Sequence, residues 1–204
     1  MSKKENKIIS IKKNDELELV IEDITTEGEG VGKIDGLALF VKDAIIGDRV
    51  KVKVMKMKKS YGYARLMEII EPSPARTEPV CPVARQCGGC QIQHMKYEEQ
   101  LKYKENKVKN CLERIGGLTL EKVSLEEMSA DSESIIADES ISFDGERIES
   151  SVAVFEPIIG MEEPYYYRNK AQFPVGKNKE GNIVTGFYAG RTHSIIDTSH
   201  CYIQ

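Results

Sequence analysis

Hydrophobic and polar residues alternate along the first third of the chain with the two-residue period of half-buried β-strands. Leu17, Leu19 and Ile21 alternate with Glu16, Glu18, Val20 and Glu22, and the valines at 50, 52 and 54 are separated by lysines. Successive side chains of a strand point to opposite faces of the sheet. We therefore expect these leucines, isoleucine and valines to point inward and the lysines to point outward.

Glycine-rich corners separate these two strands from three others. Residues 28–32 (Gly-Glu-Gly-Val-Gly) predict turn and bulge geometry, residues 37–42 predict a short apolar strand, and residues 61–66 begin the last strand. Pro72 and Pro74 end the unit. Five short strands with such corners are typical of a small OB-like barrel. The pattern thus predicts an N-terminal five-stranded β-barrel over residues 1–74.

Basic and aromatic residues are interleaved in the second half of this predicted barrel. Between residues 42 and 65 there are eight basic residues and two acidic ones. Cations combined with stacking surfaces are typical of RNA-binding proteins, although a solvated barrel face would show the same lysines. The candidate RNA-binding residues of the barrel are Lys51, Lys53, Tyr61, Tyr63 and Arg65.

Composition and charge restrict the class of protein. The chain has 204 residues, of which 40% are hydrophobic and 30% charged, and its formal net charge is −4. It contains no apolar run near the ~18–20 residues of a membrane span, and its charged N-terminus is unlike a secretory signal. We expect a soluble cytoplasmic protein with no membrane partner.

The negative charge is concentrated in one segment. Residues 118–151 carry ten acidic and two basic side chains and are rich in serine. Such a composition predicts a disordered acidic insertion. Without this segment the chain is mildly basic, so the net charge does not argue against an RNA partner.

Three cysteines provide the sharpest chemical signal. Cys81, Cys87 and Cys90 lie within ten residues, and the sequence has no secretion signal that would favour disulfides. Three thiolates need a fourth ligand, whether the centre is zinc or a [4Fe–4S] cluster. Cys201 is the better candidate, because Cys111 falls on the apolar stripe of a predicted helix over residues 97–115 and is expected to be buried there.

Zinc and iron–sulfur both remain open on the residues alone. A zinc ribbon normally has two short Cys-x-x-Cys knuckles, and this chain has one, which argues mildly against zinc. His94, His193 and His200 are alternative zinc ligands, although each is more often a surface or hydrogen-bonded histidine.

Two family resemblances follow from these motifs. Residues 10–72 resemble a TRAM domain, through residues 27–32, Phe40-Val41 and residues 47–50. The cysteine run, the helix after it and blocks at 157–161, 167–172 and 186–188 together resemble the 23S rRNA (uracil-5-)-methyltransferases of the RumA type. The resemblance implies a [4Fe–4S] cluster held by four cysteines: Cys81, Cys87, Cys90 and Cys201.

The resemblance also completes the predicted organisation. It implies that residues 75–117 and 152–204 form a small central α/β domain with the cluster, so that the fold class is β plus α/β. The block at residues 165–170 combines tyrosines with cations. Although an ordinary strand with exposed cations fits it too, the resemblance favours RNA contact by Arg168, Asn169 and Lys170.

The resemblance further implies that catalysis takes place elsewhere. Members of the family continue into a Rossmann-like domain that binds S-adenosylmethionine and supplies a cysteine nucleophile and a carboxylate base. No such domain follows Cys201 here, so we expect no catalytic residue in this chain, S-adenosylmethionine only in a full-length enzyme, and the missing methyltransferase domain as a partner. The RNA would be 23S rRNA. The alternative is a stand-alone RNA-binding module with a structural metal, zinc or iron–sulfur, and no catalysis.

Overall fold

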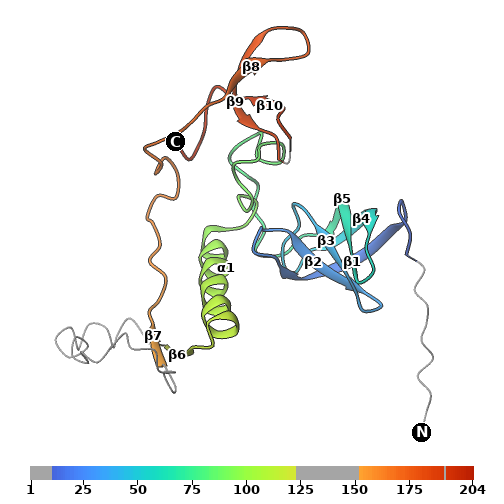
Figure 1. Cartoon of the computed structure of the whole chain (residues 1–204), viewed down its shortest axis with the longest axis vertical. Helices are drawn as coiled ribbons and strands as arrows, with labels where there is room; N and C mark the ends of the chain where they lie inside the picture. The colour runs from blue at the N-terminus through green and yellow to red at the C-terminus, as the bar shows by residue number, and fades with distance from the viewer. Residues whose placement is uncertain (1–10, 123–151, 191) are drawn as a thin grey trace, which may run out of the picture. The chain divides into compact units, whose positions relative to one another are not determined.

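The structure is a computed structural model that describes residues 11–122, 152–190 and 192–204. These residues form two compact units. The first contains the chain up to Tyr97 together with Glu163–Gln204, and the second is Glu98–Glu162. Figure 1 shows the elements of both units in chain order by colour. No helix among the described residues has the length and apolar character needed to cross a membrane.

A closed five-stranded barrel opens the first unit, as the sequence predicts (Figure 1). Its strand order is β1-β2-β3-β5-β4, and every neighbouring pair is antiparallel except β3 and β5, which run parallel. The strands are β1 (Glu16–Ile24), β2 (Gly30–Ile34), β3 (Leu37–Val41), β4 (Arg49–Met57) and β5 (Tyr61–Glu71).

The alternating residues form the barrel core. Leu19 and Ile21 of β1 are buried with Leu39 and Val41 of β3, and the three valines of β4 are fully buried. The lysines between those valines are partly exposed. The predicted inward and outward faces of these strands are therefore confirmed.

The glycine-rich segment lies partly in a strand rather than entirely in a turn. Gly28 has a positive φ of 81° and forms the turn, whereas Gly30 and Gly32 belong to β2. A Cβ on Gly32 would lie 2.1 Å from a methyl group of Leu19, and one on Gly30 would lie 2.7 Å from the carbonyl oxygen of Ala44. These glycines are needed for close packing inside the barrel, a requirement that the local sequence does not distinguish from turn formation.

The C-terminal part of the first unit is a small antiparallel sheet of order β10-β9-β8. Its strands are β8 (Val175–Lys177), β9 (Ile183–Tyr188) and β10 (Ile195–Asp197). Gly186 of β9 lies so close to β10 that an added Cβ would be 1.9 Å from the carbonyl oxygen of Ile196. The close pairing of β9 and β10 sets the course of the chain toward Cys201.

The second unit contains the predicted helix. Helix α1 (Tyr97–Asn110) continues as a π-helical turn (Cys111–Ile115), and β6 (Thr119–Lys122) pairs in parallel with β7 (Val152–Phe155). The prediction that Cys111 is buried is wrong, because its side chain is exposed and neither helical segment buries any residue. Helical periodicity defines a face, but it does not show whether another element covers that face.

The predicted acidic insertion, residues 118–151, begins with a strand. Residues 119–122 form β6, while residues 123–151 lie outside the described residues. The residues assigned to one central domain, 75–117 with 152–204, are divided between the two units in the structure.

A buried carboxylate joins the barrel to the segment that follows it. Asp48 is fully buried and accepts hydrogen bonds from the backbone N–H groups of Ile45 and Ser73, each at 2.9 Å. The Arg76 guanidinium donates to both of its oxygens and also to the carbonyl oxygen of Asp43. Burial alone would raise the pKa of Asp48, but the hydrogen bonds from Arg76 and from the two N–H groups outweigh it and lower the pKa.

We expect Asp48→Asn to reduce the free energy of unfolding by about 3–5 kcal/mol, because it leaves the largely buried Arg76 cation uncompensated. The folded-state pKa of Asp48 is lowered, so the carboxylate's contribution is complete above the pKa of about 3.9 of an unfolded aspartate. It is lost as the pH falls through the folded-state value. Urea unfolding measured from pH 7 to pH 3 should therefore show that the difference in unfolding free energy between variant and parent becomes smaller only under acid conditions.

The matched control is Glu68→Gln, which neutralises an exposed carboxylate on β5. Its unfolding free energy should stay within about 0.5 kcal/mol of the parent. Equal effects of the two substitutions would contradict the role given to Asp48.

Candidate metal centre and nucleic-acid interface

A turn-rich loop after the barrel presents three of the five cysteines. The side-chain oxygen of Gln93 accepts a hydrogen bond from the Cys81 N–H at 3.0 Å, and the Cys81 carbonyl oxygen accepts one from Ala84. The N–H of Cys87 donates to the carbonyl oxygen of Val83 at 2.8 Å. These bonds fold residues 81–93, hereafter the cysteine loop, without a regular helix or strand.

The end of β9 pairs with the cysteine loop through the backbone. Cys87 and Ala189 form an antiparallel bridge, and the Gly88 N–H donates to the carbonyl oxygen of Tyr188 at 2.9 Å. A Cβ on Gly88 would lie 2.8 Å from that same oxygen, so only glycine allows this approach. The bridge holds the C-terminal segment beside residues that precede it by about a hundred positions.

Four cysteines line one small cavity within the first unit. Cys81, Cys87, Cys90 and Cys201 border a space of about 80 Å³. The rest of the lining is mainly apolar or aromatic and includes Val83, Ala84, Phe187, Tyr202 and Ile203. Cys111 is not part of this lining.

The cavity disfavours a free thiolate at Cys90. Burial, followed by the negative charge that Cys87, Cys201 and Cys81 would carry as thiolates, raises the pKa of Cys90 to about 11, while the positive charge of Arg168 opposes this rise. The Sγ of Cys87 accepts a hydrogen bond from the Gly89 N–H at 3.3 Å. Sulfurs placed so that they repel each other as anions are suited to binding a positively charged centre, which releases their protons.

Two kinds of centre take four cysteine ligands, zinc and a [4Fe–4S] cluster. Among the described residues, no three or more His, Cys, Asp or Glu side chains form a group that would hold a metal ion. Zinc requires four donors in a tight tetrahedron, with sulfurs about 2.3 Å from the metal. A [4Fe–4S] cube would take one thiolate at each iron.

The three histidines occupy different environments. His94 is buried outside the cysteine cavity, and burial, followed by the charge of Arg76, lowers its pKa to about 4. His193 packs edge to face against Tyr188. His200 lines the cavity, with its Nε2 3.0 Å from the hydroxyl group of Tyr166.

The structure places the eight candidate RNA-binding residues at three sites. Lys51 and Lys53 lie on β4 beside β1, where the Lys51 ammonium is 3.0 Å from the Glu16 carboxylate. Hydrogen bonding and attraction between these two groups raise the pKa of Lys51 and lower that of Glu16. Because acidic side chains of β1 balance these lysines, this side of the barrel attracts phosphate less than the sequence suggests.

The aromatic candidates lie on β5, which pairs with β4 on the side away from β1. Tyr61 and Tyr63 of β5 pack against Phe40 of β3, with all three ring-centroid distances between 5.6 and 5.7 Å. Arg65 follows on β5, is exposed, and makes no ion pair with any described residue. Aromatic and cationic groups thus share one surface of β3 and β5.

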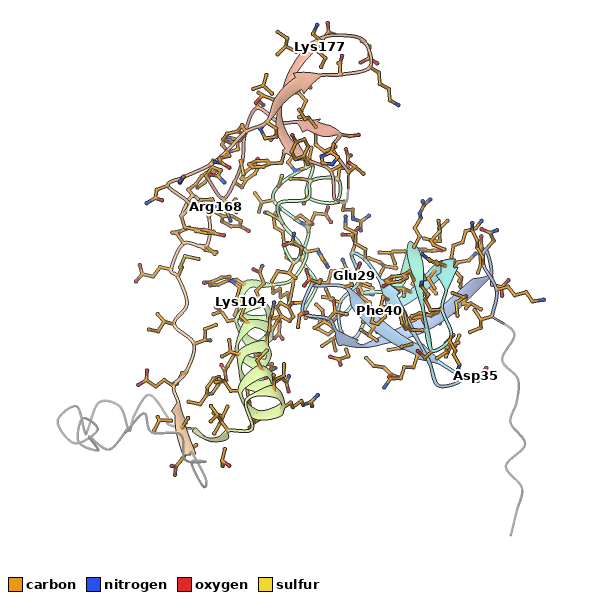
Figure 2. The ribbon with its side chains drawn as sticks, viewed as in Figure 1. Glu29, Asp35, Phe40, Lys104, Arg168 and Lys177 are labelled. Atoms are coloured by element: carbon orange, nitrogen blue, oxygen red, sulfur yellow. The ribbon has the colours of Figure 1, made fainter. Side chains whose placement is uncertain are left out.

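The third site is the segment before β8. Arg168, Asn169 and Lys170 are exposed and lie outside any strand (Figure 2 labels Arg168). Arg168 lines the cysteine cavity and, together with Lys170, a separate hollow of about 410 Å³. Its position beside four sulfurs is a feature that the local sequence does not reveal.

Sequence reasoning missed Phe40 as a stacking residue and Arg76 as the partner of a buried carboxylate. Phe40 alternates with the inward-pointing Leu39 and Val41, so its outward position follows from the strand pattern. The parallel pairing that sets it opposite Tyr63 does not follow from any local pattern. No sequence signal links Arg76 to Asp48, 28 residues earlier.

Comparisons with known proteins bear on the barrel and on the family to which the chain is similar. Residues 12–67 match the TRAM domain family, which confirms the resemblance found in the barrel. The chain is 44% identical over 198 residues to an uncharacterized RNA methyltransferase of Clostridium acetobutylicum and 45% identical over 194 residues to one of Halalkalibacterium halodurans. The matches cover 97% and 95% of this chain but 36% and 35% of those proteins, so the chain spans little more than a third of their length.

Among solved structures, the chain is similar to the tRNA (uracil-54, C5)-methyltransferase of Pyrococcus abyssi, crystallised with S-adenosyl-L-homocysteine. The TM-score is 0.47 at 21% sequence identity, and the match covers 91% of this chain and 32% of that one.

We expect Gly186→Ala to separate Cys201 from the other three cysteines, because the new methyl group would meet the β10 backbone at 1.9 Å. Alkylation followed by mass spectrometry should show faster modification of Cys201 in this variant than in the parent. Gly190→Ala is the matched control, since its Cβ would meet no atom closer than the Lys42 ammonium nitrogen at 3.8 Å. Equal Cys201 reactivity in the two variants would show that β9–β10 pairing does not position the thiol.

Proposed function

We propose that this chain is the RNA-recognition and [4Fe–4S]-bearing part of an S-adenosylmethionine-dependent methyltransferase that acts on uracil C5 in 23S rRNA. The observation that carries the proposal is the similarity of nearly the whole chain to proteins named RNA methyltransferases, of which it spans little more than a third. The TRAM match and the four-cysteine cavity support the two parts of the proposal separately.

Cys81, Cys87, Cys90 and Cys201 would hold the cluster. When bound, it would supply four iron–thiolate bonds that cross-link the cysteine loop to the C-terminal segment. The chain contributes the apolar walls that exclude water, the Gly89 N–H that donates to the Cys87 sulfur, and the nearby Arg168 cation, which offsets part of the thiolate charge. These groups give the centre a structural role in this proposal.

RNA recognition would use the barrel surface of β3 and β5 together with the segment around Arg168. Phe40, Tyr61 and Tyr63 provide faces on which unpaired bases stack. Arg65 and Lys170 make no ion pair among the described residues, so both cations are available to phosphate.

Methyl transfer would belong to the other two thirds of such a protein. S-adenosylmethionine, the nucleophile that attacks uracil C6 and the base that removes the C5 proton are assigned to that part. In this proposal the present chain binds the RNA substrate and holds the cluster.

We expect the anaerobically purified chain to be brown and to contain about four irons. Cys201→Ser should lose this iron and its visible absorption, because one of the four thiolate ligands is removed. Cys111→Ser should keep both, since Cys111 is exposed and outside the cavity. Mass spectrometry of the metal content measures iron and zinc per chain. A colourless protein with stoichiometric zinc would refute the cluster.

We expect the chain to bind 23S rRNA more tightly than tRNA at the same salt concentration and to transfer no methyl group from S-adenosylmethionine to either. Lys170→Ala should lower the salt slope of the logarithmic affinity by about 0.7, the contribution of one phosphate contact to a single strand. Lys177→Ala, on exposed β8, is the control and should leave the slope unchanged. Filter binding measures the RNA affinities and their salt slopes. Methyl transfer by the chain alone, or a preference for tRNA, would contradict the proposal.

A further inference from the structure

A groove in the first unit lies between the barrel and the cysteine loop. Its volume is about 600 Å³, within the usual range for a small-molecule site. The barrel side contributes aromatic rings and charges of both signs, and the other side contributes backbone and side chains around Cys87 and Cys90. The groove is distinct from the cysteine cavity, although these two cysteines line both.

Three contacts fix the walls of the groove. Gly28, in its left-handed conformation, lies so close to the cysteine loop that an added Cβ would be 3.0 Å from Ile92. The Lys42 ammonium donates to the carbonyl oxygen of Arg85 at 3.2 Å. The bonds from Arg76 to Asp48 anchor the start of the loop to the barrel. The groove is thus formed before any ligand arrives.

The order of the strands in the barrel determines where the residues that line the groove lie. Glu27 and Glu29 lie in the turn that leads into β2, Phe40 lies on β3, and Tyr63 and Arg65 lie on β5. In the barrel, β3 lies between β2 and β5. Figure 2 labels Glu29 and Phe40 on the barrel. Because neighbouring strands are ~4.8 Å apart, β2 and β5 are about 10 Å apart, which suits one nucleotide.

We infer that this groove binds one unpaired nucleotide of an RNA strand. Its base stacks on Tyr63 and Phe40, and its phosphate lies at Arg65, whose guanidinium has no ion pair among the described residues. This inference rests on the proposed function, which makes RNA the partner, and adds a defined site and a preference for the base.

The acidic edge determines the orientation and the preferred base. Carboxylates repel phosphate, so the phosphate binds at the opposite side of the groove, and the base edge faces Glu27 and Glu29. A carboxylate accepts a hydrogen bond from an exocyclic amino group, such as cytosine N4. Uracil offers only its N3–H, which lies between two carbonyl oxygens that repel a carboxylate. The groove therefore favours cytosine over uracil, which distinguishes it from a site for the uracil that is to be methylated.

The test measures binding of fluorescent eight-nucleotide RNAs, oligo(C) and oligo(U), to the purified chain by anisotropy. We expect tighter binding of oligo(C). Tyr63→Ala should weaken this binding by about 5- to 100-fold, the range for loss of one stacked base, and Tyr63→Phe should recover most of the loss because it keeps the ring. Arg65→Ala should weaken binding and lower the salt slope by about 0.7.

Lys58→Ala is the matched control, since it removes one exposed positive charge from the β4–β5 connection, outside the groove. It should change the affinity less than twofold. Glu27→Gln combined with Glu29→Gln should reduce the preference for oligo(C). Circular dichroism establishes that each variant keeps the barrel.

The outcomes separate the two proposals. If the parent binds RNA but Arg65→Ala and Lys58→Ala have equal effects, or Tyr63→Ala has none, the groove is not the site and the proposed RNA-binding function stands. Equal binding of oligo(C) and oligo(U) by the parent overturns the base preference. A folded chain that binds neither oligonucleotide nor 23S rRNA overturns both proposals.

Discussion

The buried carboxylate of Asp48 holds together the parts of the first unit on which the candidate sites depend. It ends the turn before β4, accepts the Ser73 N–H after β5, and binds the Arg76 guanidinium at the start of the segment leading to the cysteines. An ionised carboxylate without water is stable only when its oxygens are fully hydrogen-bonded, and here the partners come from three segments of the chain. The barrel exit and the cysteine loop are therefore held in one geometry, which also sets the wall of the groove.

The cysteine cavity depends on a second constraint, which brings a distant cysteine next to three that are close together in the sequence. Residues 81–90 place three thiols through their own turns, but the fourth arrives through a backbone bridge between Cys87 and Ala189 and through the close pairing of β9 with β10. Two glycines, Gly88 and Gly186, permit these approaches because a side chain at either position would meet backbone atoms. Burial and the neighbouring sulfurs are unfavourable for a thiolate at Cys90 unless a cationic centre binds there.

Charge pairing divides the barrel surface into two regions with different capacities for RNA. On β1 and β4, acidic and basic side chains face each other, as in the pair of Lys51 with Glu16. On β3 and β5, aromatic rings cluster beside Arg65, which lacks an ion-pair partner among the described residues. Exposed ion pairs contribute little to stability, but they do cancel the field that would attract phosphate. The surface suited to RNA is accordingly defined by which cations remain uncompensated rather than by how many the sequence contains.

Sequence patterns by themselves determined the barrel strands, the inward faces of Leu19, Ile21 and the β4 valines, the helix after the cysteines and the TRAM resemblance. These follow from local alternation and short motifs, because burial of every second residue is a property of a strand taken alone. Tertiary structure alone decided that Cys111 is exposed, that Gly30 and Gly32 pack inside strands, that Phe40 joins the tyrosines and that Arg76 reaches Asp48. Each of these depends on which distant segment lies opposite a residue, and a periodic pattern shows a face without showing its partner.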